Sequence, residues 1–249
     1  MNSIHSKNSL PRLSVLVIHY KRTDLAINAI SSIKRLGLDS IEYILSDDGT
    51  PNLSLEELSH HFDTIIVSTQ NKGLGHNMNQ AVTAARGKYL LVMQEDTEFT
   101  GNKQDLEKSM AVLDSYSQIE MIRFYGSWIV DSSEQFIECK NLPNSNQQLY
   151  ILNHKHPTFS GDAYSDMPHI RRNPCDINSD WMYLENARME ASERDYINRF
   201  LKRDAYIAFL YPNNDLIIHK GQLNSHRTSQ WDYVVAKAIK NIADKAGIN

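Results

Sequence analysis

Short apolar runs alternate with segments of helical periodicity over the first hundred residues of the chain. The first run, residues 13–18, is rich in Val and Ile, as expected of a parallel strand that is covered on both faces. Three later runs have the same character, at residues 41–45, 64–68 and 88–93. Because helical patterns separate the four runs, the sequence predicts a doubly wound, mostly parallel sheet with right-handed crossovers.

Cap and turn residues mark the ends of the helices between these strands. Thr23 precedes a helical pattern that Gly37 can end. Ser54 and Glu57 form a capping-box pattern, which predicts a short second helix. A third helix is predicted to follow the next strand and to run through Arg86.

The rest of the chain is less regular. Residues 139–180 are rich in Asn, Pro, Ser and His, which predicts long loops that are functional or mobile. The elements predicted around these loops are a strand at 120–125, a hairpin of 128–131 with 135–138, a helix at about 181–203, strands at 206–210 and 216–219, and a C-terminal helix at 231–246. Since no linker divides the chain, we expect one domain over residues 1–249.

The composition narrows the class of protein. Of 249 residues, 41% are apolar, which is typical of a globular chain. Asp and Glu number 30 against 26 Lys and Arg, so the formal charge of −4 predicts no nucleic-acid partner. The two cysteines, Cys139 and Cys175, follow no metal-ligand spacing and indicate a reducing compartment. Because no apolar run approaches the roughly 18–20 residues of a membrane span, we expect a cytoplasmic protein.

Polar clusters stand at the ends of three predicted strands. They are His19 with Tyr20, Asp47 with Asp48, and the triplet at residues 94–96. In doubly wound sheets, ligands bind beyond the carboxyl ends of the strands, so these clusters are candidates for a binding site. A carboxylate there can accept a hydrogen bond from a nucleobase or hold ribose hydroxyls, although Asp-Asp-Gly is also ordinary turn chemistry.

Five segments carry recognisable motifs. Residues 17–22 match a strand end followed by a P-T-Y-N-R loop, and residues 41–51 match a strand that ends in D-D-G-T. Residues 71–89 match the stretch that precedes a metal motif, and residues 90–96 match the D-x-D motif itself. Residues 193–210 match an acidic helix and the strand after it. Together they resemble family 2 glycosyltransferases with the GT-A fold. The resemblance implies a doubly wound α/β sheet flanked by helices, a small antiparallel extension and irregular acceptor-side loops. Residues 1–99 would bind the nucleotide sugar and residues 100–249 the acceptor.

The resemblance also implies an activity. It is that of an inverting, metal-dependent hexosyltransferase of polysaccharide biosynthesis. The donor would be a nucleotide diphosphate sugar, with a UDP-sugar preferred, and the acceptor a glycan or lipid-linked saccharide. The nucleotide-binding residues implied are His19, Tyr20, Arg22, Asp47, Asp48, Asn71, Gln94 and Glu95.

The metal site implied by the resemblance consists of Asp96 and His219. Asp96 matches the last acid of D-x-D, and His219 follows a late apolar run where many GT-A enzymes have a metal-binding histidine. His226 is an alternative in the following loop. A divalent cation neutralises a departing diphosphate, and an imidazole ligand favours Mn²⁺ over Mg²⁺.

An inverting displacement needs a general base for the acceptor hydroxyl. The family's E-D motif aligns best with Ser192–Glu193, which makes Glu193 the candidate base. Glu190 and Asp195 are alternative bases. The acids can also simply form the solvated face of a charged helix, with no catalytic role.

Two departures from the family pattern leave alternatives open. Gln94 replaces the first acid of D-x-D, and Met78 stands where the family often has an arginine for the diphosphate. Lys72, His76 and Arg86 are candidate replacements for that arginine. A second hypothesis is therefore a non-catalytic GT-A scaffold that binds nucleotide or glycan or acts in assembly. A nucleotidyltransferase is disfavoured, because no glycine-rich loop with a basic residue follows the first strand.

The acceptor side offers only general features. Trp128, Tyr164, Trp181 and Tyr183 can stack on sugar faces or belong to the core. In the predicted C-terminal helix, Val235, Ile239 and Ile242 share a face with lysines nearby, a pattern compatible with peripheral membrane contact. The sequence leaves the oligomeric state open.

Overall fold

The computed structural model describes residues 10–124, 137–142, 148–153, 168–174, 182–187, 189–203, 205–210 and 215–220. Residues 1–219 form one compact unit and residues 220–249 a second one. All the elements below belong to the first unit. The predicted hairpin strand at 128–131, His226 and the predicted C-terminal helix lie outside the described residues.

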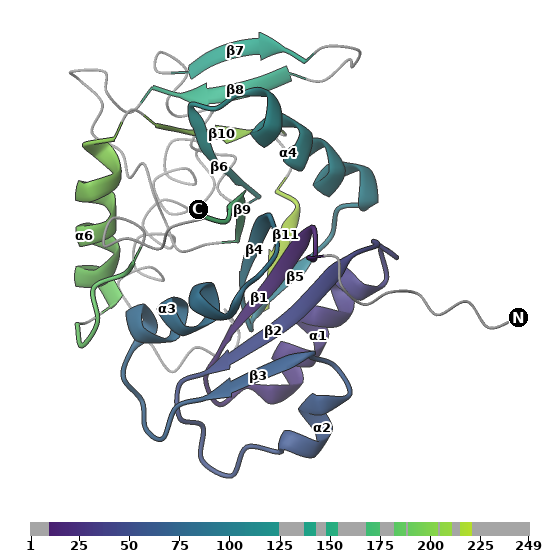
Figure 1. The fold of residues 1–249 in the computed structure, drawn as a ribbon, viewed down its shortest axis with the longest axis vertical. Coiled ribbons are helices and arrows are strands. Elements are labelled where there is room, and N and C mark those ends of the chain that lie inside the picture. Colours follow the sequence, from purple (N-terminus) through teal and green to yellow (C-terminus); the bar gives the residue numbers. More distant parts are fainter. Residues whose placement is uncertain are drawn as a thin grey trace, which may run out of the picture. The chain divides into compact units, whose positions relative to one another are not determined.

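A nine-stranded sheet forms the core of the first unit, in the order β3-β2-β1-β4-β9-β6-β10-β8-β7 (Figure 1). Its first part consists of β1 (Leu13–His19), β2 (Ile41–Asp47), β3 (Thr64–Val67) and β4 (Tyr89–Gln94). These strands run parallel to one another. Since β1 lies between β2 and β4, the strand order reverses there, which is where ligands bind in doubly wound sheets.

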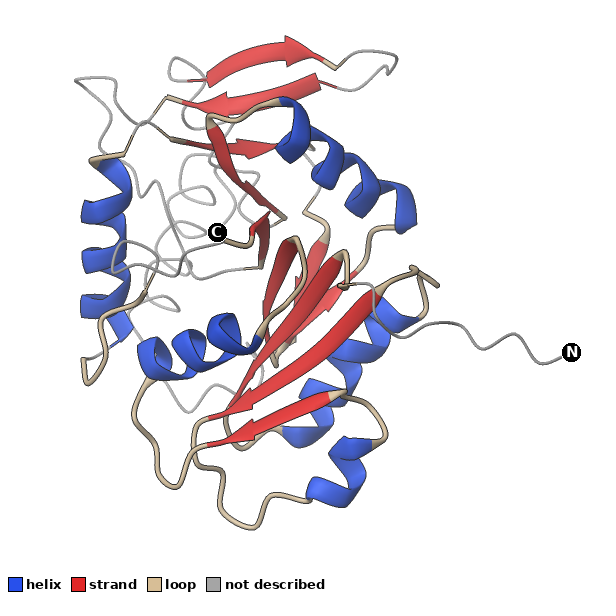
Figure 2. Cartoon of the chain, in the orientation of Figure 1, coloured by secondary structure: helices blue, strands red, loops and turns tan. Residues whose placement is uncertain are grey.

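Helices cover both faces of this parallel part (Figure 2). They are α1 (Thr23–Lys34), α2 (Leu55–Ser59) and α3 (Leu74–Ala84). Side chains alternate along a strand, so Val15 and Val17 pack in the cluster that includes Ile30 of α1, whereas Leu16 and Ile18 pack with Val82 of α3. Burying each such side chain stabilises the fold by about 1.5–3 kcal/mol, which explains the continuous apolar character of β1.

The second part of the sheet is mixed. Its elements, with the short strands and helices around them, are β5 (Thr97–Phe99), α4 (Lys103–Ser115), β6 (Ile119–Arg123), β7 (Ile137–Asn141), β8 (Gln148–Leu152), β9 (His169–Arg172), α6 (Met189–Leu201), β10 (Tyr206–Phe209) and β11 (Ile217–His219). Strand β9 is antiparallel to β4 and β6, and β8 is antiparallel to β10 and β7. Strand β10 runs parallel to β6, while β5 and β11 form a separate antiparallel pair.

The predicted α/β fold class is confirmed, and its first half agrees element by element. The third helix ends at Ala84 rather than at Arg86. The reason is tertiary: the backbone N–H of Arg86 and its guanidinium donate to Glu42 of β2, at 2.6 Å and 2.7–2.9 Å.

The prediction of loops throughout 139–180 is wrong where the structure describes that region. It contains most of β7 and all of β8 and β9. Strand β9 has the sequence His-Ile-Arg-Arg, which carries no strand-like apolar pattern. His169 and Arg171 are nevertheless buried, and Arg171 donates to the hydroxyl of Tyr196 at 2.8 Å. Polar groups supplied by a distant helix make this strand possible.

The helices and the cysteines bear on the predicted location of the protein. None of the described helices is long and apolar enough to cross a bilayer. Cys139 is exposed and not in a disulfide, while Cys175 lies outside the described residues.

Candidate functional site

The carboxyl ends of β1, β2 and β4 bring the predicted polar clusters together. The register pairs His19 with Asp47 and Ile18 with Gln94, so the last residues of the three strands are neighbours. The backbone N–H of Glu95 donates to the carbonyl of Ile18 at 3.0 Å, which ties the turn after β4 to β1. Sequence motifs more than seventy residues apart therefore share one edge of the sheet.

Asp47 and His19 form a buried pair at this edge. Nδ1 of His19 lies 2.7 Å from Oδ1 of Asp47, and both side chains are fully buried. Oδ2 of Asp47 accepts the backbone N–H groups of Gly49 and Thr50 at 3.0 Å and 2.8 Å. Burial acts to raise the pKa of Asp47, but the hydrogen bonds from His19 and Thr50 outweigh it and lower that pKa.

The His19 ring keeps one nitrogen for a further partner. Among the described residues, Nε2 of His19 has no hydrogen-bond partner although it is buried. Because Asp47 holds Nδ1, the arrangement favours the tautomer in which Nε2 is an acceptor. Both oxygens of Asp47 are engaged by its own chain, so Asp47 orients the ring and the turn. A direct nucleotide contact by Asp47 stays a prediction.

Asp48 fixes the loop that leads into α3. Its Oδ1 accepts the N–H of Lys72 at 2.8 Å and its Oδ2 that of Gly73 at 2.9 Å. Gly73 has a φ of +91°, a backbone conformation that favours glycine. Asn71 is exposed on the same loop. The N-terminus of α3, which carries partial positive charge, is thereby held at the carboxyl edge of the sheet.

Arg22 joins the start of α1 to the acids after β4. Its Nε donates to Oε1 of Glu95 at 2.8 Å, and its Nη1 lies 2.7 Å from Oδ2 of Asp96. Both carboxylates are buried. Burial raises the pKa of Glu95, and the nearby charge of Arg22 offsets only part of that rise. For Arg22, burial acts to lower the pKa, but Glu95 and Asp96 more than compensate and raise it.

Tyr20 and Gln94 complete the edge. Tyr20 is half-buried, and the ammonium of Lys21 lies 4.6 Å from the centre of its ring. The backbone carbonyl of Gln94 accepts the hydroxyl of Thr97 at 2.7 Å, which closes the turn that carries the two acids. These contacts place both residues at the predicted site, and their roles toward a nucleotide stay predictions.

Asp96 and His219 come together across β5 and β11. The ladder pairs His219 with Thr97, and Nε2 of His219 lies 3.7 Å from Oδ1 of Asp96. In the described part of the chain, that oxygen of Asp96 is buried without a hydrogen-bond partner. A carboxylate oxygen in this state that faces Nε2 of an imidazole fits a divalent cation. The described residues contain no cluster of three or more His, Cys, Asp or Glu side chains for a metal, so substrate oxygens and water would complete the shell.

Helix α6 carries the candidate bases and packs against α3. Asp195 is engaged within its helix, since Arg199 donates to its Oδ2 at 2.8 Å and 3.0 Å. Glu193 is half-buried, and the side chain of Glu190 lies outside the described residues. The hydroxyl of Ser192 donates to the carbonyl of Leu184 at 3.0 Å. Asp195 is thus paired with Arg199, and the assignment of Glu193 as the base stays a prediction.

Residues 14–160 match the family model for glycosyl transferase family 2, which is more than half of the chain. The chain belongs to the family 2 glycosyltransferases. A curated relative, the putative colanic acid biosynthesis glycosyl transferase WcaA of Escherichia coli, is 31% identical over 100 residues, covering 37% of this chain and 35% of that protein. The match thus spans about a third of the relative's length.

Solved structures of S. aureus TarS share the fold of this family 2 glycosyltransferase. TarS 1–349 superposes with a TM-score of 0.56 at 18% identity, over 82% of this chain and 59% of that one. The complex of TarS 1–349 with UDP-GlcNAc superposes with a TM-score of 0.50 at 14% identity, over 89% and 63% of the two chains. At these identities the similarity confirms the α/β architecture.

Residues 182–187 are attached to α3 by a network that sequence reasoning missed. Asn79 accepts the N–H of Tyr183 at 2.7 Å and donates to Glu185 at 2.9 Å. Nδ1 of His76 lies 2.9 Å from the other oxygen of Glu185. Hydrogen bonds from Asn79 and His76 lower the pKa of Glu185. Because this segment precedes α6, the network connects α3 to the helix of Glu193.

Lys72, His76 and Arg86 are the candidate replacements for the missing arginine, and they lie in different surroundings. Met78 is fully buried in the core. Arg86 is paired with Glu42 near the amino end of β2, away from the carboxyl edge, so its candidacy is wrong. His76 is held by Glu185 and Lys72 lies on the Asp48 loop, and both stay candidates.

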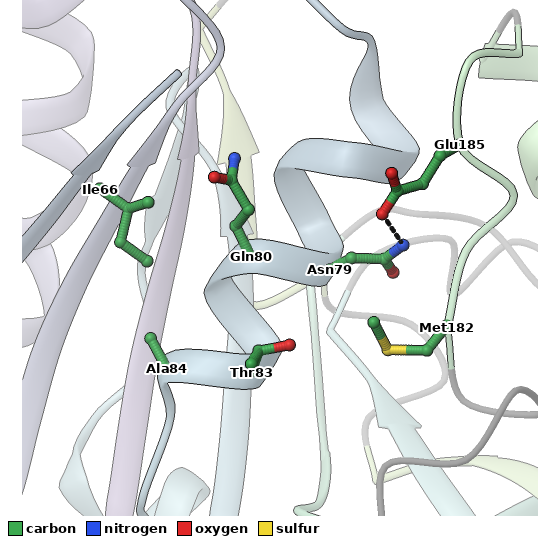
Figure 3. A pocket seen from close by; sticks show the side chains of 7 residues that line it. All are labelled: Ile66, Asn79, Gln80, Thr83, Ala84, Met182 and Glu185. Atoms are coloured by element: carbon green, nitrogen blue, oxygen red, sulfur yellow. Dashed lines mark hydrogen bonds between the residues drawn. The ribbon is translucent and has the colours of Figure 1, made fainter. Parts of the chain in front are cut away.

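A shallow pocket lies along α3 (Figure 3). Its volume is about 310 Å³, and it is lined by Ile66, Asn79, Gln80, Thr83, Ala84, Met182 and Glu185. None of the predicted site residues is among these lining residues. The pocket belongs to the Asn79–Glu185 network rather than to the carboxyl edge.

Proposed function

We propose that this family 2 glycosyltransferase transfers a sugar, with inversion, from a nucleotide diphosphate donor to a glycan or lipid-linked saccharide. A UDP-sugar is the first donor to test. The observation that carries the proposal is the convergence of Arg22, Glu95, Asp96 and His219 at the switch point of the sheet. Cationic and metal-binding groups at that place suit a diphosphate leaving group.

Asp96 and His219 are the residues that would hold Mn²⁺ or Mg²⁺. When bound, the cation supplies positive charge that stabilises the departing diphosphate. His19 accepts a hydrogen bond from the nucleoside through Nε2 in this proposal, and Tyr20 borders it. The set assigned to the nucleotide also includes Arg22, Asp47, Asp48, Asn71, Gln94 and Glu95.

Glu193 is the proposed general base. Its carboxylate takes the proton of the acceptor hydroxyl while that oxygen forms a bond to the anomeric carbon. The bond between the anomeric carbon and the diphosphate breaks, and its electron pair leaves with the diphosphate. Attack from the opposite face accounts for the inversion.

The remaining proposals concern the setting of the reaction. Residues 1–99 serve the donor and residues 100–249 the acceptor within one domain. A cytoplasmic location suits a soluble nucleotide sugar, and a lipid-linked acceptor would bring the chain to a membrane surface.

The test measures donor binding and turnover separately. Purified protein is titrated calorimetrically with UDP, UDP-sugars and GDP-sugars in the presence of Mn²⁺, and sugar release is followed with the same donors. We expect micromolar to millimolar binding and slow donor hydrolysis without acceptor. Absence of both binding and hydrolysis with every UDP- and GDP-sugar would refute the proposal.

A second candidate is a scaffold that binds a nucleotide sugar without transferring it. The uncharged Gln94 and the fully buried Met78, in places where the family has charged residues, favour it. Binding of UDP without hydrolysis or transfer, unchanged in Glu193→Gln, would support this second function.

A further inference from the structure

Arg22 occupies the space between the two acids that follow β4. Its planar guanidinium contacts Glu95 through Nε and Asp96 through Nη1, at 2.8 Å and 2.7 Å. The side chains of Glu95 and Asp96 are 8% and 6% exposed, whereas that of Arg22 is 35% exposed. The remaining nitrogen, Nη2, also contacts Glu95, at 2.5 Å from Oε1. All three nitrogens therefore face the acids, and the N–H groups of Nη1 and Nη2 that the acids do not use are left for another acceptor.

A fixed positive charge lies beside the proposed cation site. Arginine keeps its charge at every relevant pH, and Arg22 contacts both Glu95 and Asp96, so it reduces the negative charge that a divalent cation meets there. Arg22 also occupies Oδ2 of Asp96, so only Oδ1, on the side of His219, remains for a cation. A divalent cation that arrives alone meets one carboxylate oxygen, one imidazole and a neighbouring positive charge.

A nucleotide diphosphate changes this balance. Its oxygens can contact the bound cation and, at the same time, the N–H groups of Arg22 that the two acids do not use. Arginine forms strong, oriented hydrogen bonds to phosphate oxygens. The positive charge that opposes the cation alone then favours the complex of cation and diphosphate.

We propose that Arg22 is a built-in counter-cation of the metal site, which weakens binding of the divalent cation alone and strengthens binding of the nucleotide diphosphate with it. The inference rests on the proposed function and adds a coupling between the two ligands. Coupling of this kind is reciprocal, because each ligand raises the affinity for the other by the same factor. The site would load the cation together with the donor.

A purely structural role for Arg22 predicts a different outcome. If the guanidinium only neutralised the buried acids, its removal would disturb the carboxyl edge of the sheet and weaken the binding of both Mn²⁺ and UDP. Opposite changes in the two affinities are therefore the signature of the proposed role.

The test compares the wild type with Arg22→Gln. Mn²⁺ binding is measured by titration without nucleotide, and UDP binding is measured with saturating Mn²⁺ and again with EDTA. We expect Arg22→Gln to bind Mn²⁺ alone about fivefold more tightly, since one opposing charge at short range is removed. We expect UDP binding with Mn²⁺ to weaken by at least about tenfold, since hydrogen bonds to a charged group are lost.

Arg12→Gln is the matched control. Arg12 also pairs with a carboxylate, Glu107 at 2.6 Å, but it precedes β1 at the opposite end from the site. Neither affinity should change in this variant. Arg22→Lys keeps the charge and loses the planar fork, so its affinity for Mn²⁺ alone should match the wild type while its affinity for UDP is intermediate.

Several results would overturn the inference. They are parallel weakening of both ligands in Arg22→Gln, unchanged Mn²⁺ affinity in that variant, tighter Mn²⁺ binding in Arg22→Lys, or equal UDP binding with Mn²⁺ and EDTA. If Arg22→Gln does not fold, the Arg22→Lys titrations decide alone. Binding of Mn²⁺ without any nucleotide binding by the wild type would refute the proposed function, whereas the Mn²⁺ titrations would still measure the effect of Arg22.

Discussion

Asp47 and Asp96 are two buried acids at strand ends on either side of β1, and their surroundings are opposite. Asp47 is the last residue of β2, and its two oxygens accept hydrogen bonds from its own turn and from His19. Asp96 follows β4 and uses one oxygen for Arg22, while the other faces His219 without a hydrogen-bond partner in the described chain.

Asp47 therefore stabilises the carboxyl edge of the sheet, whereas Asp96 has an oxygen that a ligand can use. A buried carboxylate with every oxygen satisfied contributes to stability, because its hydrogen bonds exist only in the folded chain. A buried oxygen without a hydrogen-bond partner costs stability and is retained where a ligand uses it. Four substitutions test this distinction.

Asp96→Asn should have the largest effect. We expect turnover to fall by about a thousandfold, because a metal ion contributes several kcal/mol of charge stabilisation to a displacement. The unfolding midpoint should change little, since Arg22 keeps Glu95 as a partner. Initial rates with saturating Mn²⁺ measure the loss. Asp63→Asn, an acid that accepts the N–H of Tyr43 at 2.8 Å, is the control with unchanged turnover.

Asp47→Ala should mainly reduce stability. The free energy of unfolding is expected to fall by about 3 kcal/mol, since the N–H groups of Gly49 and Thr50 and the ring of His19 lose their acceptor. Urea denaturation measures the change, and Asp47→Asn, which keeps one acceptor, should lose less. Unchanged stability together with lost nucleotide binding would make Asp47 a direct contact and remove the contrast with Asp96.

Glu193→Gln tests a second pair of acids, this time on one helix. Turnover should fall by about a hundredfold, within the usual contribution of a general base, while UDP affinity stays constant. Asp195→Asn is the matched control, because Asp195 is bound to Arg199, and its turnover should fall less than about twofold. A larger loss in Asp195→Asn than in Glu193→Gln would exchange their assignments.

Glu42 provides the smallest effect and a dependence on pH. Burial acts to raise the pKa of Glu42, but hydrogen bonds from Ser14 and Arg86 lower it below its usual value. A depressed folded pKa means that the stabilisation is present above the unfolded pKa and is lost as pH falls through the folded pKa. Glu42→Gln should therefore cost about 1–2 kcal/mol at pH 7 and less at pH 3. Urea midpoints measured at both pH values check this, and a difference that grows in acid would contradict the assignment.

The sequence predicted the first half of the fold more accurately than the second. Strands β1, β2 and β4 are largely buried parallel strands, whereas the edge strand β3 is partly exposed. Their apolar runs are local signals that need no knowledge of partners. Strand β9 carries no such signal, because its buried His169 and Arg171 depend on residues from other elements. Helix α3 likewise ends two residues before the predicted Arg86, which donates hydrogen bonds to Glu42 of a distant strand.

The candidate site divides in the same manner. Motif spacing placed the polar clusters at strand ends and identified Asp96, His219 and Glu193 as candidates. It did not indicate that Arg22 bridges Glu95 and Asp96, or that Asn79 attaches residues 182–187 to α3. Such contacts join residues far apart in the chain, and no local pattern encodes them.

Apolar periodicity, strand-end acids and family motifs by themselves determined the fold class, the family and the edge of the sheet where ligands bind. These properties follow from the local order of residue types. The tertiary structure decided which carboxylate oxygens are hydrogen-bonded within the chain and which are left for a ligand. That choice depends on strand order and register, which bring Arg22 to Asp96 and Asp47 to His19.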